Sequence, residues 1–369
     1  MAVKTIVVSA VNIRRGGTLK ILRDCLSYLS TMATDSNFRI VAIVHNKELV
    51  KFDGIEYIEM PAIIKNWGKR LWCEYVTMHK ISKELFPVDL WLSLHDTTPR
   101  VLARKQAMYC QTSFPFLKLR WRDIIFDYKI VLFGLFTYFA YRINIYRNNH
   151  IIVQADWLKQ KFSRMLNVDP EVFIVAPPQE SDKIWPEKKM DKDTYDFLYV
   201  SIADCHKNIE EICRAAEILE KEVGKDKFNV YLTIDGTENR YSRWIYRTWG
   251  HVDSIRFLGY LTRQEVDDHY ANAECVIFPS RIETWGLPIS EFRSTRKPML
   301  LANLPYAHEA SIGCDKVAFF NPEDPDELAG LMKQLLMNDE SSLHPVVGHS
   351  QCNDTKVYGW DELFECLLK

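Results

Sequence analysis

Two carboxylates, Glu283 and Glu291, are separated by seven residues and could contact a single polar ligand. The apolar run at 275–278 predicts a buried strand, and Pro288 suits the first turn of a following helix because its φ is fixed and it has no N–H. We expect the backbone N–H groups around Gly286 to Ile289, at the start of this helix, to be unpaired and electropositive, which suits a phosphate. Carboxylates beside a phosphate would repel it, so we expect both glutamates to face sugar or ribose hydroxyls.

Lys207 is a candidate cation for the same phosphate. An apolar run at 197–200 predicts a strand, and an apolar stripe that starts at Ile209 predicts a helix after it. Ligands of parallel sheets bind at the carboxyl ends of strands, and Lys207 stands at that junction, where its ammonium can meet a diphosphate. Asn208 is the expected N-cap, and Glu211 three residues later predicts a capping box. The alternative for Lys207 is a solvent-exposed cation near a helix cap.

These residues must be positioned by alternating strands and helices. Strand-like apolar runs alternate with segments of helical period along most of the chain, which predicts an α/β fold with parallel sheets and helices on both faces. A chain of 369 residues suits two domains. The predicted parts are a first domain at 1–180, a polar linker at 181–194, a second domain at 195–350 and a final helix at 351–369.

The glutamate motif and its surroundings resemble the signature of the family-four retaining glycosyltransferases, of the kind used in bacterial polysaccharide and lipopolysaccharide biosynthesis, O-antigen included. That signature is Glu-x7-Glu with an internal Gly-(Phe/Leu), after a strand and a Pro-Ser. Here it stands as Glu283 to Glu291 with Gly286-Leu287-Pro288 inside and Pro279-Ser280 before it. The resemblance covers the C-terminal half closely and the N-terminal half loosely. It implies the GT-B fold, two Rossmann-like domains facing a cleft, with the last helix crossing back to the first domain.

The resemblance also implies an activity and roles for residues. A sugar would pass, with retention, from a nucleotide-diphosphate sugar to a hydroxyl of a glycan or lipid-linked glycan, with the donor as substrate and no other cofactor. Glu283 would contact the donor sugar, Glu291 the ribose and Lys207 the diphosphate, with Glu283 and Lys207 catalytic. Stabilising the departing diphosphate then matters more than a strong base. The other expected donor contacts are Thr284, Gly286, Leu287, Pro288 and, beside the base, Gly259.

One cation that the resemblance leads us to expect is missing. Many members of that family carry an Arg five residues before the diphosphate-binding Lys, where this chain has Ile202. Either Lys207 carries more of the charge, or Arg281, Arg293 or Arg296 substitutes for the missing side chain.

Candidate acceptor contacts lie in the first half of the chain. Gly16 and Gly17 allow a tight turn after the first predicted strand, and in the resembled family a Gly-Gly here faces the cleft; a simple turn is the alternative. His95, Asp96 and Arg100 follow the predicted strand at 90–94, at the end where ligands bind. A lone His there can instead be a structural hydrogen-bonding residue.

Residues 113–147 are rich in Phe and Tyr and carry flanking Lys and Arg. The nearly unbroken apolar run at 130–141 is shorter than the ~20 residues of a spanning helix. It fits an interfacial segment with cations toward anionic lipid, or a large buried helix. A lipid-linked acceptor would explain the former, so we expect peripheral contact with the inner face of the membrane.

Composition excludes some classes and leaves others open. A net charge of −2 gives no whole-molecule attraction to nucleic acid. Nine cysteines without paired spacing favour a reduced, cytoplasmic compartment. No Asp-x-Asp stands at the end of a predicted strand, so we expect no metal. The alternatives are a sugar-nucleotide 2-epimerase, a non-catalytic membrane-associated protein of the same fold, and a dinucleotide oxidoreductase, which lacks its Gly-x-Gly-x-x-Gly fingerprint here.

Overall fold

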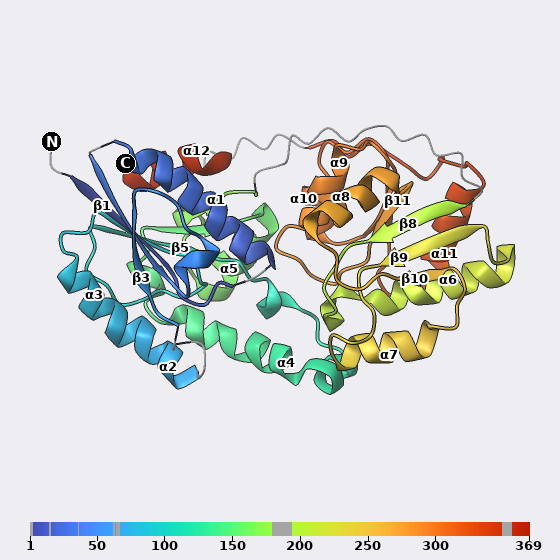
Figure 1. Ribbon diagram of the computed structural model, residues 1–369, viewed down its shortest axis with the longest axis horizontal. Coiled ribbons are helices and arrows are strands. Elements are labelled where there is room, and N and C mark those ends of the chain that lie inside the picture. The colour runs from blue at the N-terminus through green and yellow to red at the C-terminus, as the bar shows by residue number, and fades with distance from the viewer. Residues whose placement is uncertain are drawn as a thin grey trace. The chain divides into compact units, whose positions relative to one another are not determined.

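The computed structural model describes residues 3–14, 16–35, 37–61, 63, 67–178, 194–348 and 356–369. It divides the chain into two compact units, whose elements are labelled in Figure 1. Unit 1 consists of Met1–Pro115, Leu135–Gln179 and Cys352–Lys369, and unit 2 of Phe116–Gly134 and Glu180–Gln351.

Unit 1 is built on a parallel sheet of seven strands in the order β3-β2-β1-β4-β5-β6-β7. Its strands are β1 (Lys4–Ala10), β2 (Phe38–Val44), β3 (Ile55–Glu59), β4 (Leu90–Ser93), β5 (Lys105–Tyr109), β6 (His150–Val153) and β7 (Phe173–Val175). Its helices include α1 (Gly16–Ala33), α2 (Trp67–Trp72), α3 (Met78–Glu84), α5 (Asp156–Leu166) and α12 (Gly359–Leu368). The strand order reverses between β1 and β4, and in such sheets ligands bind beside the loops that follow the strands at this point.

The strands of unit 1 are apolar on both faces because helices cover both. Ile6 and Val8 of β1 pack in one cluster with residues of α1 and α12, whereas Val7 packs in a second cluster with Trp91 of β4. Leu363, Phe364 and Leu367 of α12 lie in the first of these clusters. The predicted return of the C-terminal helix to the first domain is therefore confirmed.

Unit 2 is built on a parallel sheet of six strands in the order β10-β9-β8-β11-β12-β13. Its strands are β8 (Tyr195–Tyr199), β9 (Phe228–Leu232), β10 (Ile255–Phe257), β11 (Cys275–Phe278), β12 (Met299–Ala302) and β13 (Val317–Phe320). Its helices are α6 (Ile209–Val223), α7 (Arg240–Trp249), α8 (Arg263–Asn272), α9 (Leu287–Arg293), α10 (Pro305–Ala310) and α11 (Pro325–Leu336). The order reverses between β8 and β11, the strands that precede Lys207 and Glu283. The predicted α/β class with two Rossmann-like sheets is confirmed.

The boundaries differ from the predicted ones in one respect. Residues 116–134 fall within the predicted first domain, but they belong to unit 2. The reason is specific packing: Asp123 pairs with Arg281, and the Phe126 ring lies against the rings of Tyr241 and Trp244 with centroids 5.8 and 5.2 Å away. The predicted linker lies almost wholly outside the described residues.

Helix α4 (Trp121–Arg142) begins in unit 2 and ends in unit 1, with a non-helical residue, Asp127, near its start. The helix has 22 residues and is longer than the apolar run predicted at 130–141. By length and composition alone it could cross a membrane. Only 17% of its most apolar window is buried. The alternative of a large buried helix is therefore wrong.

Candidate active site

The loops after β8 and β11 meet because these strands are neighbours, with Cys275 paired to Phe197. The loop after β8 contains a short helix, η7 (Cys205–Lys207), before α6, and the loop after β11 leads into α9. Arg281 on the second loop donates its backbone N–H to the His206 carbonyl on the first, at 2.8 Å. The switch point of this sheet thus brings together the two predicted catalytic residues.

Lys207 and Glu283 are in direct contact. The Lys207 Nζ lies 2.5 Å from Glu283 Oε1, and each side chain is only 14% exposed. The Lys207 carbonyl accepts from the Tyr199 hydroxyl at 2.9 Å, and that hydroxyl lies 3.0 Å from Ser280 Oγ. The ammonium is therefore paired with the carboxylate, and the buried Tyr199 contacts both loops on which the pair stands.

Glu291 has different partners from Glu283. Its Oε1 accepts from Arg263 Nη1 at 2.6 Å and its Oε2 from the Tyr270 hydroxyl at 3.1 Å. Burial, and then the nearby Glu291 charge, raise the pKa of Tyr270 well above its usual value, so this phenol stays a donor. A carboxylate held in this way presents fixed acceptors toward hydroxyl groups, and its predicted contact with ribose stays a prediction.

Gly286 stands immediately before α9 with φ +96°, in the left-handed region that favours glycine. A Cβ there would lie 3.1 Å from Ile289 Cδ1. The predicted helix start is confirmed, because α9 begins at Leu287 and Pro288 occupies its first turn. The expectation that every N–H from Gly286 to Ile289 is unpaired is wrong, because the Ile289 N–H donates to the Gly286 carbonyl at 2.9 Å. Thr284 lies on the same loop, between β11 and α9.

Gly259 follows β10 with φ +74°, and its N–H donates to the Ile234 carbonyl at 3.2 Å. A Cβ on this residue would lie 3.1 Å from Asp235 Oδ2. The Asp235 carboxylate accepts from the hydroxyl and the N–H of Thr237, which lowers its pKa. Only glycine suits this turn, and its predicted contact with the base remains a prediction.

Asn208 does not act as the predicted side-chain cap. It occupies the position before α6 with φ +57°, but its amide points away from the helix N–H groups. Its Oδ1 accepts from Arg120 at 2.9 Å, and its Nδ2 donates to the carbonyls of Pro322 at 2.7 Å and Pro279 at 3.2 Å. The predicted capping box is wrong because this amide joins three loops instead.

Two of the proposed substitutes for the missing cation point elsewhere. The Arg281 guanidinium is 7% exposed and pairs with Asp123, which is 2% exposed. Arg293 Nη1 donates to the Ile312 carbonyl at 2.9 Å, and Arg296 lies in an exposed position with φ +55°. Lys207 is the cation that contacts Glu283 at the switch point.

The acceptor candidates lie in unit 1, near the ends of β1 and β4. His95 is 1% exposed; its Nδ1 lies 2.9 Å from the Ser9 carbonyl, and its Nε2 lies 2.6 Å from Glu74 Oε1. The carbonyl can only accept, so Nδ1 carries a proton. This arrangement matches the structural alternative for His95. Glu74, on the π-helical turn Cys73–Thr77, gave no signal in the sequence.

Asp96 and the glycines remain candidates for acceptor contact. Asp96 has φ +58° and accepts from the Gln111 N–H, and burial raises the pKa of its carboxyl. Gly16 has φ +67° with open space around it, Gly17 lies in the first turn of α1, and Arg100 is exposed. Among the residues that the structure describes, no three His, Cys, Asp or Glu side chains gather as a metal site requires. Metal independence stays a prediction.

Two parallel-sheet units with polar loops at their switch points define the GT-B fold, and solved structures share it. WaaG, a glycosyltransferase involved in lipopolysaccharide biosynthesis, matches with a TM-score of 0.63 over 99% of this chain and 98% of its own, at 13% identity. HepE from Anabaena, in complex with UDP-glucose, matches with a TM-score of 0.63 over 92% and 91%, at 13% identity. At this identity the likeness shows the fold alone.

Residues 180–345 match the family described as "Glycosyl transferases group 1". The match covers most of the predicted second domain, and the resemblance drawn from the Glu-x7-Glu stretch is confirmed. The O-antigen chain mannosyltransferase RfbU of Salmonella typhimurium is 24% identical over 198 residues, which cover 53% of this chain and 54% of that protein. The chain spans about half the length of the curated relatives it matches.

Proposed function

We propose that this chain is a retaining glycosyltransferase that moves a sugar from a nucleotide-diphosphate sugar to a hydroxyl of a glycan or lipid-linked glycan. The observation that carries the proposal is the contact of Lys207 with Glu283 at the switch point of a group 1 domain. The names of similar proteins support this choice of donor and acceptor. HepE binds UDP-glucose, and the curated relatives are O-antigen mannosyltransferases. The acceptor that we propose is accordingly a precursor of a lipopolysaccharide or a related polysaccharide.

In the proposed reaction the bond between the anomeric carbon and the diphosphate breaks, a bond to the acceptor oxygen forms on the same face of the sugar, and the leaving diphosphate takes up the proton of the acceptor hydroxyl. The departing diphosphate gains negative charge as this happens. The Lys207 ammonium stabilises that charge, while Glu283 faces the sugar and Glu291 faces the ribose. A preorganised cation in a partly buried site is effective because little solvent screens it, so this step needs no metal ion.

Replacing Glu283 by Gln should separate binding of the diphosphate from transfer of the sugar. The ion pair competes with the diphosphate for Lys207, and the carboxylate repels the incoming anion. We expect Glu283→Gln to bind UDP or GDP about three- to tenfold more tightly, ~0.7–1.4 kcal/mol, and to transfer sugar more slowly. Isothermal titration calorimetry and a transfer assay measure the two effects. Weaker nucleotide binding by this variant would contradict the assigned competition.

A thermal-shift screen tests the proposed function most directly. We expect one nucleoside diphosphate or its sugar to raise the melting temperature without added metal, by an amount equivalent to ~2.7 kcal/mol at a hundred times its Kd. The shift should shrink in Glu291→Ala, which loses the acceptors held by Arg263 and Tyr270. Glu265→Ala, at the exposed start of α8, is the matched control and should keep the full shift.

The outcomes of this screen also separate the alternatives. Nucleotide release that requires an acceptor identifies the transferase, and a changed configuration of the sugar on intact nucleotide identifies the epimerase. Binding of a nucleotide sugar without either reaction identifies a non-catalytic protein that keeps the fold. No shift with any nucleotide sugar would overturn the proposal.

We further propose that the protein works at the inner face of the membrane and that α4 contacts anionic lipid. After the non-helical Asp127, large apolar side chains on this helix are exposed at intervals of three or four residues, which places them on one face. Exposed Lys129, Arg142 and Arg147 accompany them. Contiguous apolar surface of this kind usually marks an interaction site. The face, called the α4 stripe, comprises Tyr128, Leu132, Leu135, Phe136 and Phe139.

A further inference from the structure

The loop that carries Lys207 is held by a separate hydrogen bond at each of its residues, 205 to 208. The Cys205 carbonyl accepts from Arg281 Nη2 at 3.3 Å, and the His206 carbonyl accepts from the Arg281 backbone N–H at 2.8 Å. The Lys207 carbonyl accepts from Tyr199, and the Asn208 side chain accepts from Arg120. The loop backbone is therefore fixed on all sides, and the Lys207 ammonium is held through its ion pair with Glu283.

Two of these donors depend on residues 118–123, which belong to unit 2 although they lie far from the rest of it in the sequence. Asp123 binds the Arg281 guanidinium through both carboxylate oxygens, and the Lys118 carbonyl accepts from Arg281 Nη1 at 3.2 Å. Asp123 also accepts the Arg120 N–H at 2.7 Å, which fixes the start of α4. Asp123 thus orients Arg281 toward the Cys205 carbonyl and sets the position of Arg120.

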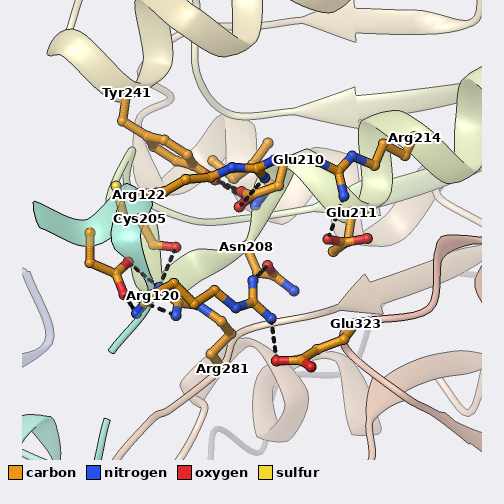
Figure 2. A network of polar contacts seen from close by, with 12 residues as sticks. Arg120, Arg122, Cys205, Asn208, Glu210, Glu211, Arg214, Tyr241, Arg281 and Glu323 are labelled. Carbon is orange, nitrogen blue, oxygen red and sulfur yellow. Dashed lines mark hydrogen bonds and ion pairs between the residues drawn. The ribbon is translucent and has the colours of Figure 1, made fainter. Parts of the chain in front are cut away.

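Arg120 makes the most informative contact of this segment. Figure 2 shows its guanidinium between Asn208 and Glu323, with Nη1 2.9 Å from Asn208 Oδ1 and Nη2 2.8 Å from Glu323 Oε1. Asn208 is fully buried in the left-handed region, and Glu323 is 67% exposed. The contact with Asn208 reaches the residue next to Lys207, whereas the contact with Glu323 lies at the surface and contributes little.

We propose that residues 118–123 position the Lys207 loop for the donor diphosphate, with Arg120 and Asp123 as positioning residues. The inference rests on the proposed function, since it assigns these residues to the same site. Arg281 takes part in this assembly as the link between Asp123 and the loop. A loop fixed before the ligand arrives loses less conformational freedom on binding, so the affinity for the diphosphate is higher. The gain in affinity comes from the phosphate group that contacts Lys207.

The test compares nucleotides that differ by one phosphate. Dissociation constants for UDP, UMP, GDP and GMP are measured by calorimetry on the full chain and on Arg120→Ala. We expect Arg120→Ala to weaken binding of the diphosphate that the wild type binds by about tenfold, which is ~1.4 kcal/mol. Binding of the matching monophosphate should change less than twofold. In the transfer assay the KM for the donor should rise more than kcat falls.

Matched variants separate positioning from a general loss of structure. Glu323→Gln removes only the charge of the exposed partner of Arg120 and should leave both affinities unchanged. Arg120→Lys keeps one donor and should recover part of the diphosphate affinity. Asp123→Asn breaks a buried ion pair and is followed by circular dichroism, because loss of fold there says nothing about positioning.

Each outcome decides the inference. If the wild type binds UDP or GDP and Arg120→Ala binds it equally well, residues 118–123 are structural only and the inference fails. Equal losses for diphosphate and monophosphate would also overturn it, because they show a general disturbance of the domain. If no nucleoside diphosphate binds the wild type in the thermal-shift screen, the proposed function itself fails, and the inference fails with it.

Discussion

Lys207→Ala is expected to lower kcat for sugar transfer by about a hundred- to a thousandfold, the loss that follows removal of one preorganised group that stabilises charge in a transition state. Lys207 is 14% exposed and contacts Glu283 at 2.5 Å, so the ammonium acts where solvent screens it poorly. Arg281 and Arg293 are held by Asp123 and Ile312 and do not replace it. Nucleotide release in the presence of acceptor measures the effect, with circular dichroism as the check on folding.

Two further variants show whether the loss comes from this ammonium. Lys207→Arg keeps the charge on a planar group and should retain more activity than Lys207→Ala. Lys221→Ala removes a lysine that pairs with Glu217 on the exposed side of α6, and it should leave transfer unchanged. A loss of less than fivefold in Lys207→Ala would show that another group stabilises the departing diphosphate.

The donor side of the site could be predicted from sequence because its chemistry lies on short local motifs. Glu283 to Glu291 spans a strand end and a helix start, and Lys207 stands at the corresponding junction after β8. Local reasoning placed both junctions, and parallel pairing of β8 with β11 then brought Lys207 and Glu283 together. The alternation of strands and helices was enough for the fold class, because parallel sheets need helical connections between their strands.

Contacts between residues far apart in sequence could not be predicted in the same way. Asp123 and Arg281 are separated by 158 positions, and nothing around either one indicates the other. Asn208 resembles a helix cap by type and position, yet Arg120 and two proline carbonyls take its amide. Glu74 and His95 are in contact only because helix and strand pack together in the folded chain. Such pairs depend on tertiary structure, and a single sequence carries no local signal of them.

The sequence indicated the apolar composition of the α4 stripe but not its exposure. The apolar and aromatic composition of 113–147 was plain, but periodicity does not separate a buried helix from an exposed one when both faces are apolar. In the structure the face that carries Asp123, Thr137 and Tyr141 is buried, and the α4 stripe is exposed. Leu132, Leu135, Phe136 and Phe139 are between 47% and 65% exposed.

Replacing Leu132, Leu135, Phe136 and Phe139 together by Gln should abolish binding to anionic vesicles. Each side chain has about half of its surface left to bury in a bilayer, which contributes about 1 kcal/mol per residue. The combined loss of ~4 kcal/mol corresponds to roughly a thousandfold weaker partitioning. Co-sedimentation with vesicles of phosphatidylethanolamine and phosphatidylglycerol measures it. Met337→Gln with Val347→Gln, which removes exposed apolar side chains from another part of the chain, should leave partitioning unchanged.

The basic side chains on and beside α4 allow a second, independent test of membrane binding. Neutralising Lys129, Arg142 and Arg147 should weaken binding to anionic vesicles by about 1 kcal/mol for each cation near the surface, and added salt should weaken the wild type in the same direction. Vesicles of phosphatidylcholine should show neither dependence. Unchanged sedimentation of the four-residue variant would refute the membrane assignment. Self-association of the wild type without vesicles, lost in that variant, would instead show that the α4 stripe is an interface with a second copy of the chain.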